Sequence, residues 1–312
     1  MPILTVRHVT TYRYANPVSF SPHRMMFRPR DSHDLRLLDS AVIISPPPAR
    51  LRWLHDVFGN SIAVAEFETD ATELRFESDI TIETFGLAGP DYPIEEFARA
   101  FPFSYPAEEM ADLARTNERH YADPEHKVDA WARQFLQPPF QKEGEPPQTW
   151  ALLEGMTRHI KETFTYQARD LMGTQTPLET LDLNSGTCRD FALLMMEAAR
   201  SLGLAARFVS GYLYDPAADG GPDGTLGGGA THAWVQVYLP GAGWVEFDPT
   251  NALIGTHSLI RVAVAREPWQ AVPLSGEWFG APADFLGMTV DVTVTSGRQQ
   301  AADAEAPPPA ES

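Results

Sequence analysis

An α+β fold with a β-rich N-terminal domain is predicted by three features of the sequence. The segment ELRFESDITIETF, residues 73–85, alternates apolar and polar side chains, which is typical of a strand with one buried face. In residues 149–163 apolar side chains recur at spacings of three and four, which predicts an amphipathic helix. The segment that starts at Cys188 repeats this helical spacing, and several strand-like segments follow it.

The remaining elements follow in chain order. Residues 3–85 are predicted to form antiparallel strands with breaks such as Gly59-Asn60, and helical patterns appear near 107–120 and 126–136. Beyond the cysteine helix, strands are expected at 205–214, 232–240, 243–251 and 287–295. We therefore divide the chain into a β-rich domain at 1–90, a second domain with a helical lead-in at 91–297, and a disordered tail at 298–312, which has no apolar periodicity.

Composition argues against several classes of partner. The chain has 24 Lys and Arg against 42 Asp and Glu, a formal net charge of −18, so we expect no nucleic acid and no membrane surface as a partner. The first residues lack the basic segment and apolar block of a secretory signal. A single cysteine among 312 residues cannot form an internal disulfide, which fits a reducing compartment. We therefore expect a cytoplasmic location.

The lone cysteine lies where a turn gives way to a helix. Residues 184–186 are turn formers, and the helix that follows ends at Gly203. In the first helical turn, free backbone N–H groups and the positive end of the helix dipole stabilise a thiolate at Cys188, and Arg189 adds a positive charge. The same N–H groups can receive an oxyanion. The alternative is a small buried residue that fills a gap, since free cysteine is among the most buried residue types.

Two further residues favour the catalytic interpretation. His232 starts one predicted strand and Asp248 ends the next, and the turn LPGAG between them predicts an antiparallel hairpin. The hairpin brings the start of the first strand next to the end of the second. A thiol needs a base for its proton, and the base needs an acceptor that fixes its tautomer. Each residue alone has an ordinary structural explanation, but the three together predict a Cys-His-Asp triad.

The segments that carry these residues, GTCRDFALLMMEAARSLGLAARFVSGYLY and THAWVQVYLPGAGWVEFDPTN, resemble the core of the transglutaminase-like superfamily, particularly its bacterial members. HVTTYRYANPVSFSPHRMMFRPR and DVFGN resemble the β-rich N-terminal domain that accompanies that core. The resemblance implies a papain-like α+β core in which a cysteine-bearing helix packs against an antiparallel sheet. It also implies that Cys188 is the nucleophile, His232 the general base and acid, and Asp248 the residue that orients the imidazole. Gln236 departs from the glutamate of many relatives, and we expect its side chain at the sheet surface.

The implied chemistry is acyl transfer from an amide of a protein or peptide substrate through a thioester. A primary amine acceptor makes the enzyme a transglutaminase, whereas water makes it a cysteine protease or amidohydrolase, and the triad does not decide between them. A third hypothesis is a binding or scaffold protein that keeps the fold without turnover. No cofactor and no metal are expected.

Five further residues are candidates for supporting or substrate-binding roles. Tyr166 and Gln175 are candidates for the second oxyanion donor. Asp190 is expected to bind the helix N-terminus near the thiolate. Tyr212 is expected to reach the site from the adjoining strand. Trp234 is a candidate for a substrate groove, although a core position is favoured because aromatic residues that alternate in strands are usually core.

Overall fold

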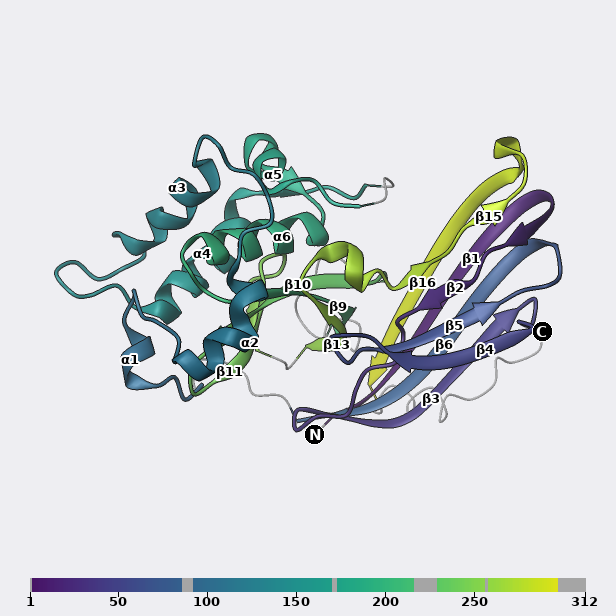
Figure 1. Cartoon of the computed structure of the whole chain (residues 1–312), viewed down its shortest axis with the longest axis horizontal. Coiled ribbons are helices and arrows are strands. Elements are labelled where there is room, and N and C mark those ends of the chain that lie inside the picture. Colours follow the sequence, from purple (N-terminus) through teal and green to yellow (C-terminus); the bar gives the residue numbers. More distant parts are fainter. Residues whose placement is uncertain (1, 86–91, 170–172, 216–228, 256–257, 297–312) are drawn as a thin grey trace, which may run out of the picture. The chain divides into compact units, whose positions relative to one another are not determined.

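The structure is a computed structural model that describes residues 2–85, 92–169, 173–215, 229–255 and 258–296. It confirms the α+β fold (Figure 1). The described residues form two compact units, one from 2–85, 212–215, 229–231 and 273–296, and one from those between 92 and 211 and between 232 and 272. The tail predicted at 298–312 lies outside the described residues.

The first unit is built from two antiparallel sheets. One contains β15, β1, β6 and β3 in that order, with β16 also paired to β1, and the other contains β14, β2, β5 and β4. Tyr14, Met25, Ala63 and Phe76, which come from four strands of the two sheets, belong to one buried apolar core. The elements are β1 (Ile3–Phe20), β2 (His23–Met25), β3 (Leu35–Ser45), β4 (Arg50–His55), β5 (Ser61–Glu66), β6 (Ala71–Thr84), β14 (Leu274–Ser275), β15 (Trp278–Phe279), η4 (Pro282–Asp284) and β16 (Phe285–Ser296).

The last strand joins the first unit, which differs from the division made on the sequence. β16 runs antiparallel to β1, with Leu4 opposite Ser296 and Thr10 opposite Val290. The sequence pattern correctly indicates a strand here, but a strand belongs to the sheet that supplies its hydrogen-bond partners, and an alternating pattern does not name them.

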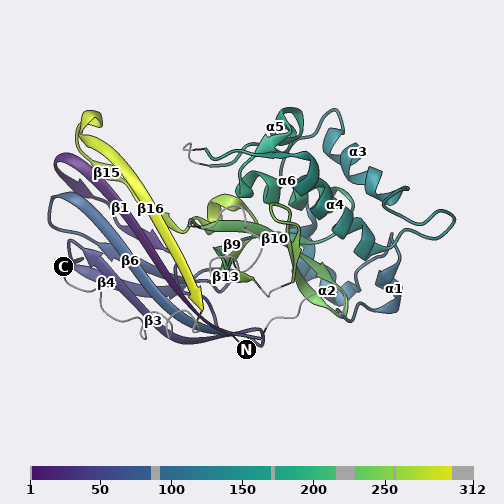
Figure 2. The same cartoon turned by 180° about the vertical axis from the view of Figure 1, so that it is seen from behind.

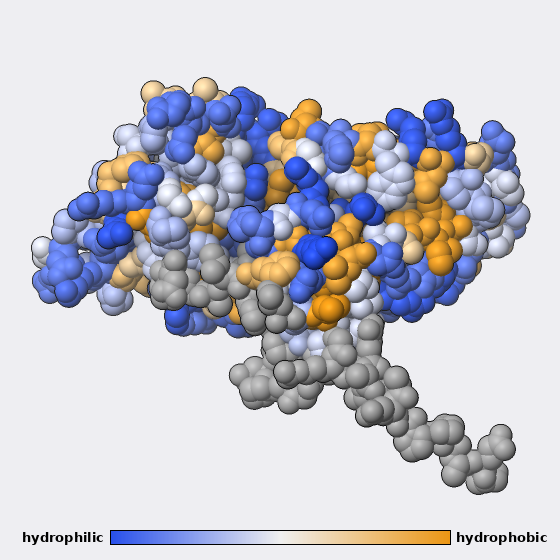
Figure 3. All heavy atoms as spheres, turned by 90° about the horizontal axis from the view of Figure 1, so that it is seen from below, coloured by the Kyte–Doolittle hydropathy of each residue, from blue (hydrophilic) through white to orange (hydrophobic). Residues whose placement is uncertain are grey.

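Some apolar side chains of this unit remain at its surface. Ile43 on β3 and Trp53 on β4 are 59% and 47% exposed. Both strands lie at sheet edges. Figure 3 shows hydrophobic side chains among hydrophilic ones on the molecular surface.

The second unit combines helices with a five-stranded antiparallel sheet of order β12, β11, β10, β9 and β13. α6 packs beside β10, as Figures 1 and 2 both show. β9 starts in this unit and ends in the first. The elements are α1 (Glu96–Arg99), α2 (Ala107–Asn117), α3 (Lys127–Arg133), η1 (Gln134–Leu136), α4 (Thr149–Thr163), β7 (Thr165–Tyr166), α5 (Pro177–Leu183), β8 (Ser185–Gly186), α6 (Cys188–Ser201), β9 (Ala206–Leu213), β10 (His232–Leu239), β11 (Gly243–Asp248), β12 (Leu253–Ile254), β13 (Leu259–Ala265) and η3 (Pro268–Ala271).

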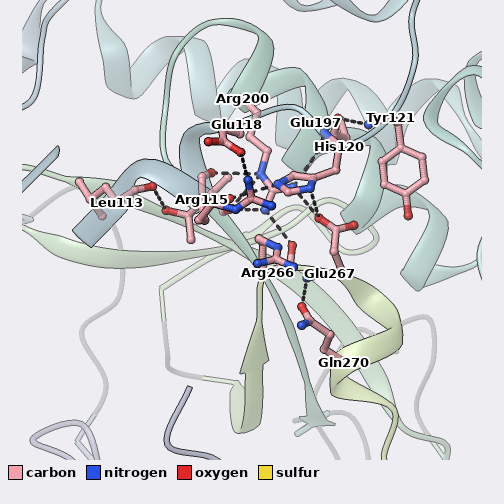
Figure 4. A network of polar contacts seen from close by, with 12 residues as sticks. Leu113, Arg115, Glu118, His120, Tyr121, Glu197, Arg200, Arg266, Glu267 and Gln270 are labelled. Carbon is pink, nitrogen blue, oxygen red and sulfur yellow. Dashed lines mark hydrogen bonds and ion pairs between the residues drawn. The ribbon is translucent and has the colours of Figure 1, made fainter. Parts of the chain in front are cut away.

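The helix α6 has the bounds expected from the sequence, and Gly203 follows it with a positive φ of 82°. It is buried on nearly every side, including its charged residues Glu197 and Arg200. Arg200 Nη1 donates to Glu197 at 2.9 Å and to Glu267 at 3.1 Å, and other guanidinium N–H groups donate to the backbone carbonyls of Thr116, Ala206 and Arg266 (Figure 4). This buried cluster fixes the C-terminal end of α6 to β9, to the chain before η3 and to the end of α2.

No helix among the described residues is long and apolar enough to cross a membrane.

Candidate active site

Cys188 is the first residue of α6 and is 7% exposed. The segment before it is held in place because Asp190, which is completely buried, accepts hydrogen bonds at 2.8 Å from both the N–H and the hydroxyl of Thr187. N–H groups in the first turn of a helix have no partner within the helix. The position therefore offers donors for an anion beside the sulfur, as the sequence analysis expected.

His232 and Asp248 meet on one face of the β10–β11 hairpin. Val235 lies opposite Phe247 in the antiparallel register, so Asp248 is diagonal to the first residue of β10. His232 Nε2 lies 2.9 Å from Asp248 Oδ2, and both side chains are fully buried. The predicted hairpin geometry is confirmed.

The carboxylate of Asp248 is held by two further donors. The N–H of Thr250 donates to Oδ1 at 2.9 Å, and the side-chain amide of Asn251 donates to Oδ2 at 2.9 Å. Burial raises the pKa of Asp248, but the positive charge and hydrogen bond of His232 and these two donors outweigh it, so the pKa is lowered. Asn251 was not predicted as a site residue, although it belongs to the turn DPTN that follows the strand of Asp248.

The surroundings of His232 favour the protonated form of its imidazole. Burial lowers the pKa of its imidazole, but the charge and hydrogen bond of Asp248, together with Cys188, raise it to about 10. Because Nε2 donates to an ionised carboxylate, the other ring nitrogen is the one left for the thiol. His232 Nδ1 is buried and meets no described group at full hydrogen-bond geometry, but the Cys188 side chain is near enough to raise the pKa of the imidazole through a hydrogen bond and its charge.

Both candidate oxyanion donors border the chain that leads into Cys188. Tyr166 on β7 lies opposite Gly186 on β8 in a parallel pair. Burial, followed by the neighbouring Cys188, raises the pKa of Tyr166 to about 12, so its hydroxyl keeps its proton. Gln175 donates its backbone N–H to Asp190 at 2.7 Å, and its side-chain oxygen accepts from the hydroxyl of Thr180 at 3.1 Å. The choice of donor stays a prediction.

Asp190 has a wider role than the sequence suggested. Besides Thr187 it binds Arg169, whose Nη2 donates to Oδ1 at 3.0 Å. Together with the bond from Gln175, these contacts tie the two ends of the segment 169–175 to the start of α6.

Tyr212 belongs to the first unit, where its hydroxyl lies 2.9 Å from His8 Nδ1. The structure therefore assigns this side chain a partner within the β-rich unit.

Trp234 is completely buried, in agreement with the core position favoured by the sequence. Its indole lies beside His232, with ring centroids 6.0 Å apart and an interplanar angle of 30°. Because the Trp234 side chain is completely buried, it does not line an open groove. Its connection to the site is its contact with His232.

The prediction that the Gln236 side chain lies at the sheet surface is wrong. Its side chain is 1% exposed, donates to Glu246 at 2.6 Å and accepts from Arg207 at 2.6 Å. β10 is a central strand of the sheet, it packs beside α6, and the residues of both its faces are buried around Gln236. Glu246 itself was missed by the sequence analysis. Its signal was its place two residues before Asp248, on the same face of β11.

No group of three or more His, Cys, Asp or Glu side chains suited to a metal ion occurs among the described residues.

Comparisons with known proteins identify the family of the chain. Residues 4–83 match the bacterial transglutaminase-like N-terminal region, and residues 140–249 match the transglutaminase-like superfamily. An uncharacterized protein of Mycobacterium tuberculosis is 30% identical over 306 residues, which cover 94% of this chain and 93% of that protein. An uncharacterized protein of Mycobacterium leprae is 26% identical and covers 93% and 98%. The chain therefore belongs to the transglutaminase-like superfamily and carries its bacterial N-terminal region.

Two further matches bear on the fold and on function. A crystal structure named "Putative Cysteine Protease from Cytophaga hutchinsonii" superposes with a TM-score of 0.68 over 95% of this chain and 91% of that chain, at 18% identity, which shows the shared fold. A protein-glutamine gamma-glutamyltransferase of Pseudomonas aeruginosa is 27% identical over 187 residues, which cover 59% of this chain and 27% of that protein.

Proposed function

We propose that the protein is a thiol enzyme that transfers acyl groups from amides of proteins or peptides to primary amines, with Cys188, His232 and Asp248 as its catalytic residues. The observation that carries the proposal is the buried pair of His232 and Asp248, in which Nε2 is bound to the carboxylate and the Cys188 side chain acts on the same imidazole and raises its pKa. A histidine held in this state supports a thiolate and supplies a proton to a leaving amine.

The reaction follows from these assignments. The Cys188 thiolate adds to the amide carbonyl, and N–H groups at the start of α6 stabilise the oxyanion. His232 Nδ1–H gives its proton to the leaving nitrogen, the C–N bond breaks, and an amine or ammonia departs from the thioester. The neutral Nδ1 then takes a proton from the incoming amine, which attacks the thioester, forms a new amide and releases the thiolate. Asp248 keeps its charge throughout and holds Nε2–H.

Transfer to an amine is favoured over hydrolysis because the matching Pseudomonas aeruginosa protein is named a gamma-glutamyltransferase. Hydrolysis by the same residues is the alternative, with water in place of the amine. A non-catalytic binding role is the third candidate, and the intact set of Cys188, His232 and Asp248 argues against it.

The test is intact-mass spectrometry after incubation with a glutamine-bearing peptide library and a labelled primary amine. Wild type, Cys188→Ala and His232→Gln are compared, with His33→Gln as a matched control because His33 is exposed. Amine incorporation by wild type and by His33→Gln alone supports transfer. Cleavage or deamidation without incorporation indicates a hydrolase. If Cys188→Ala gives the same products as wild type, thiol catalysis is ruled out.

A further inference from the structure

A second carboxylate on β11 repeats the geometry of Asp248 one step along the hairpin. Glu246 lies opposite Gln236, and its side chain accepts a hydrogen bond from the indole N–H of Trp234, which is diagonal to it. Asp248 accepts from His232 with the same diagonal offset. His232 and Trp234 lie two residues apart and therefore on the same face of β10, and each ring is bound by one carboxylate of β11.

The indole is confined on its other side as well. Gly211 on β9 lies opposite His232. A Cβ at Gly211 would lie 2.8 Å from the Trp234 ring and 2.0 Å from the carbonyl oxygen of Ile260. The indole therefore occupies the space that a side chain opposite the histidine would need, and it cannot tilt away without losing its bond to Glu246.

A buried carboxylate as the partner of an indole N–H costs desolvation free energy. Trp234 and Glu246 are both completely buried, and a backbone carbonyl would satisfy the N–H without a charge. Burial raises the pKa of Glu246, and Arg261 opposes this effect from 2.6 Å. Gln236, itself held by Arg207, donates to the same carboxylate at 2.6 Å. Arg261 and Gln236 thus hold the carboxylate that binds the indole beside His232.

Resting on the function proposed above, we propose that Glu246 is a positioning residue that holds the Trp234 indole against His232, where the ring stabilises the imidazolium. The ring centroids lie 6.0 Å apart, at the limit of the range in which an aromatic ring attracts a cation. The groups that act on the imidazole are then Asp248 from β11, Cys188 from α6 and the indole from β10 itself. Tyr166 on β7 keeps its proton and brings no charge.

The experiment measures the protonation of His232 and the reactivity of Cys188, neither of which needs a substrate. The imidazole is titrated by NMR in histidine-labelled protein, with the signal assigned from His232→Gln, and Cys188 is alkylated with iodoacetamide over the same pH range. Trp234→Leu is expected to lower the pKa of His232 by about one pH unit and to slow alkylation several-fold at about pH 9.5, where the wild-type imidazole is mostly protonated and the variant imidazole mostly neutral. Trp131→Phe is the control, because Trp131 lies on α3 and not on the strand of His232. It is expected to change neither the pKa of His232 nor the rate of Cys188 alkylation.

A double-mutant cycle tests the role of Glu246. Glu246→Gln in the wild type is expected to lower the pKa of His232 in the same direction, whereas in the Trp234→Leu background it is expected to add no further shift, because the anchored ring is already absent. Trp234→Phe keeps an aromatic face without the N–H and is expected to fall between wild type and Trp234→Leu. Circular dichroism of each variant identifies any that does not fold.

Folded variants with the wild-type titration of His232 would overturn the inference, as would a shift for Glu246→Gln that persists in the Trp234→Leu background. These results leave the proposed function intact if alkylation still depends on His232. If Cys188 is alkylated as fast in His232→Gln as in wild type, that result would contradict both the proposed function and this inference.

Discussion

His232 Nε2 and Asp248 Oδ2 lie 2.9 Å apart with both side chains fully buried. A buried carboxylate paired with a buried imidazolium fixes the ring orientation and the tautomer, and it leaves Nδ1 for the thiol. The first two predictions follow from this pair.

Asp248→Asn removes the charge without changing the shape of the side chain. The amide can still accept from the N–H of Thr250, but it no longer stabilises the imidazolium. We expect thioester formation to slow on the order of 10²- to 10⁴-fold. The burst of nitrophenol from p-nitrophenyl acetate measures this step, and Asp70→Asn, at an exposed position, serves as the control. A burst that is unchanged in Asp248→Asn would mean that Asp248 has no role in acylation.

The protonation of His232 gives a prediction about pH. Its pKa is raised to about 10, so its ring signals are expected to stay constant between pH 6 and pH 8 and to titrate near pH 10. The corresponding stability is fully present below the unfolded pKa of about 6.5 and is lost as the pH rises through about 10. In Asp248→Asn burial becomes the dominant influence, and the pKa of His232 is expected to fall below 6.5. NMR titration of both proteins checks this, and a wild-type histidine that titrates near pH 6.5 would contradict the assignment.

Tyr166 and Gln175 can be separated as oxyanion donors by comparing two reactions. Acylation by an ester passes through an oxyanion, whereas alkylation by iodoacetamide does not. Loss of the true donor is expected to slow acylation by about 10²-fold and to leave alkylation within about twofold. Tyr166→Phe and Gln175→Leu are compared in both reactions. We expect the selective loss in Tyr166→Phe, because Tyr166 has Cys188 as an electrostatic neighbour.

The sequence predicted the parts of the site that depend on local pattern. The start of α6 at Cys188 and the hairpin that joins His232 to Asp248 both follow from turn residues and periodicity. Long-range placement was not predictable in this way. Gln236 and Glu197 lie on elements buried on both faces, where a polar side chain is satisfied by protein groups rather than by water, and for Glu197 these include the N–H of His120, 77 residues away. Tyr212 likewise bonds to His8, 204 residues earlier.

The buried His8 is expected to make the stability of the β-rich unit sensitive to acid. Its ring is 1% exposed and lies 2.9 Å from both the Tyr212 hydroxyl and the Thr10 hydroxyl, and burial lowers its pKa to about 4. The unfolded state binds a proton below about pH 6.5 and the folded state only below about pH 4, so stability falls as the pH falls through this window, by up to about 3 kcal/mol. Urea unfolding at pH 7 and pH 4.5 is expected to show a smaller acid loss in His8→Gln than in wild type. His33→Gln, at an exposed position, is expected to keep the wild-type loss, and an equal loss in His8→Gln would count against the assignment.

The buried cluster around Arg200 gives the largest expected change in stability. Its side chain and that of Glu197 are completely buried, and Glu267 is 7% exposed, so Arg200→Met leaves two buried carboxylates without their cation (Figure 4). Removal of one partner from such a buried pair costs about 3 to 5 kcal/mol. Arg158→Met on α4 is the matched control, because Arg158 is 63% exposed and also pairs with a glutamate of its own helix, a contact that contributes less than about 1 kcal/mol. The midpoint of urea unfolding is expected to fall strongly in Arg200→Met alone. Equal midpoints for the two variants would show that the cluster adds no more to stability than a surface ion pair.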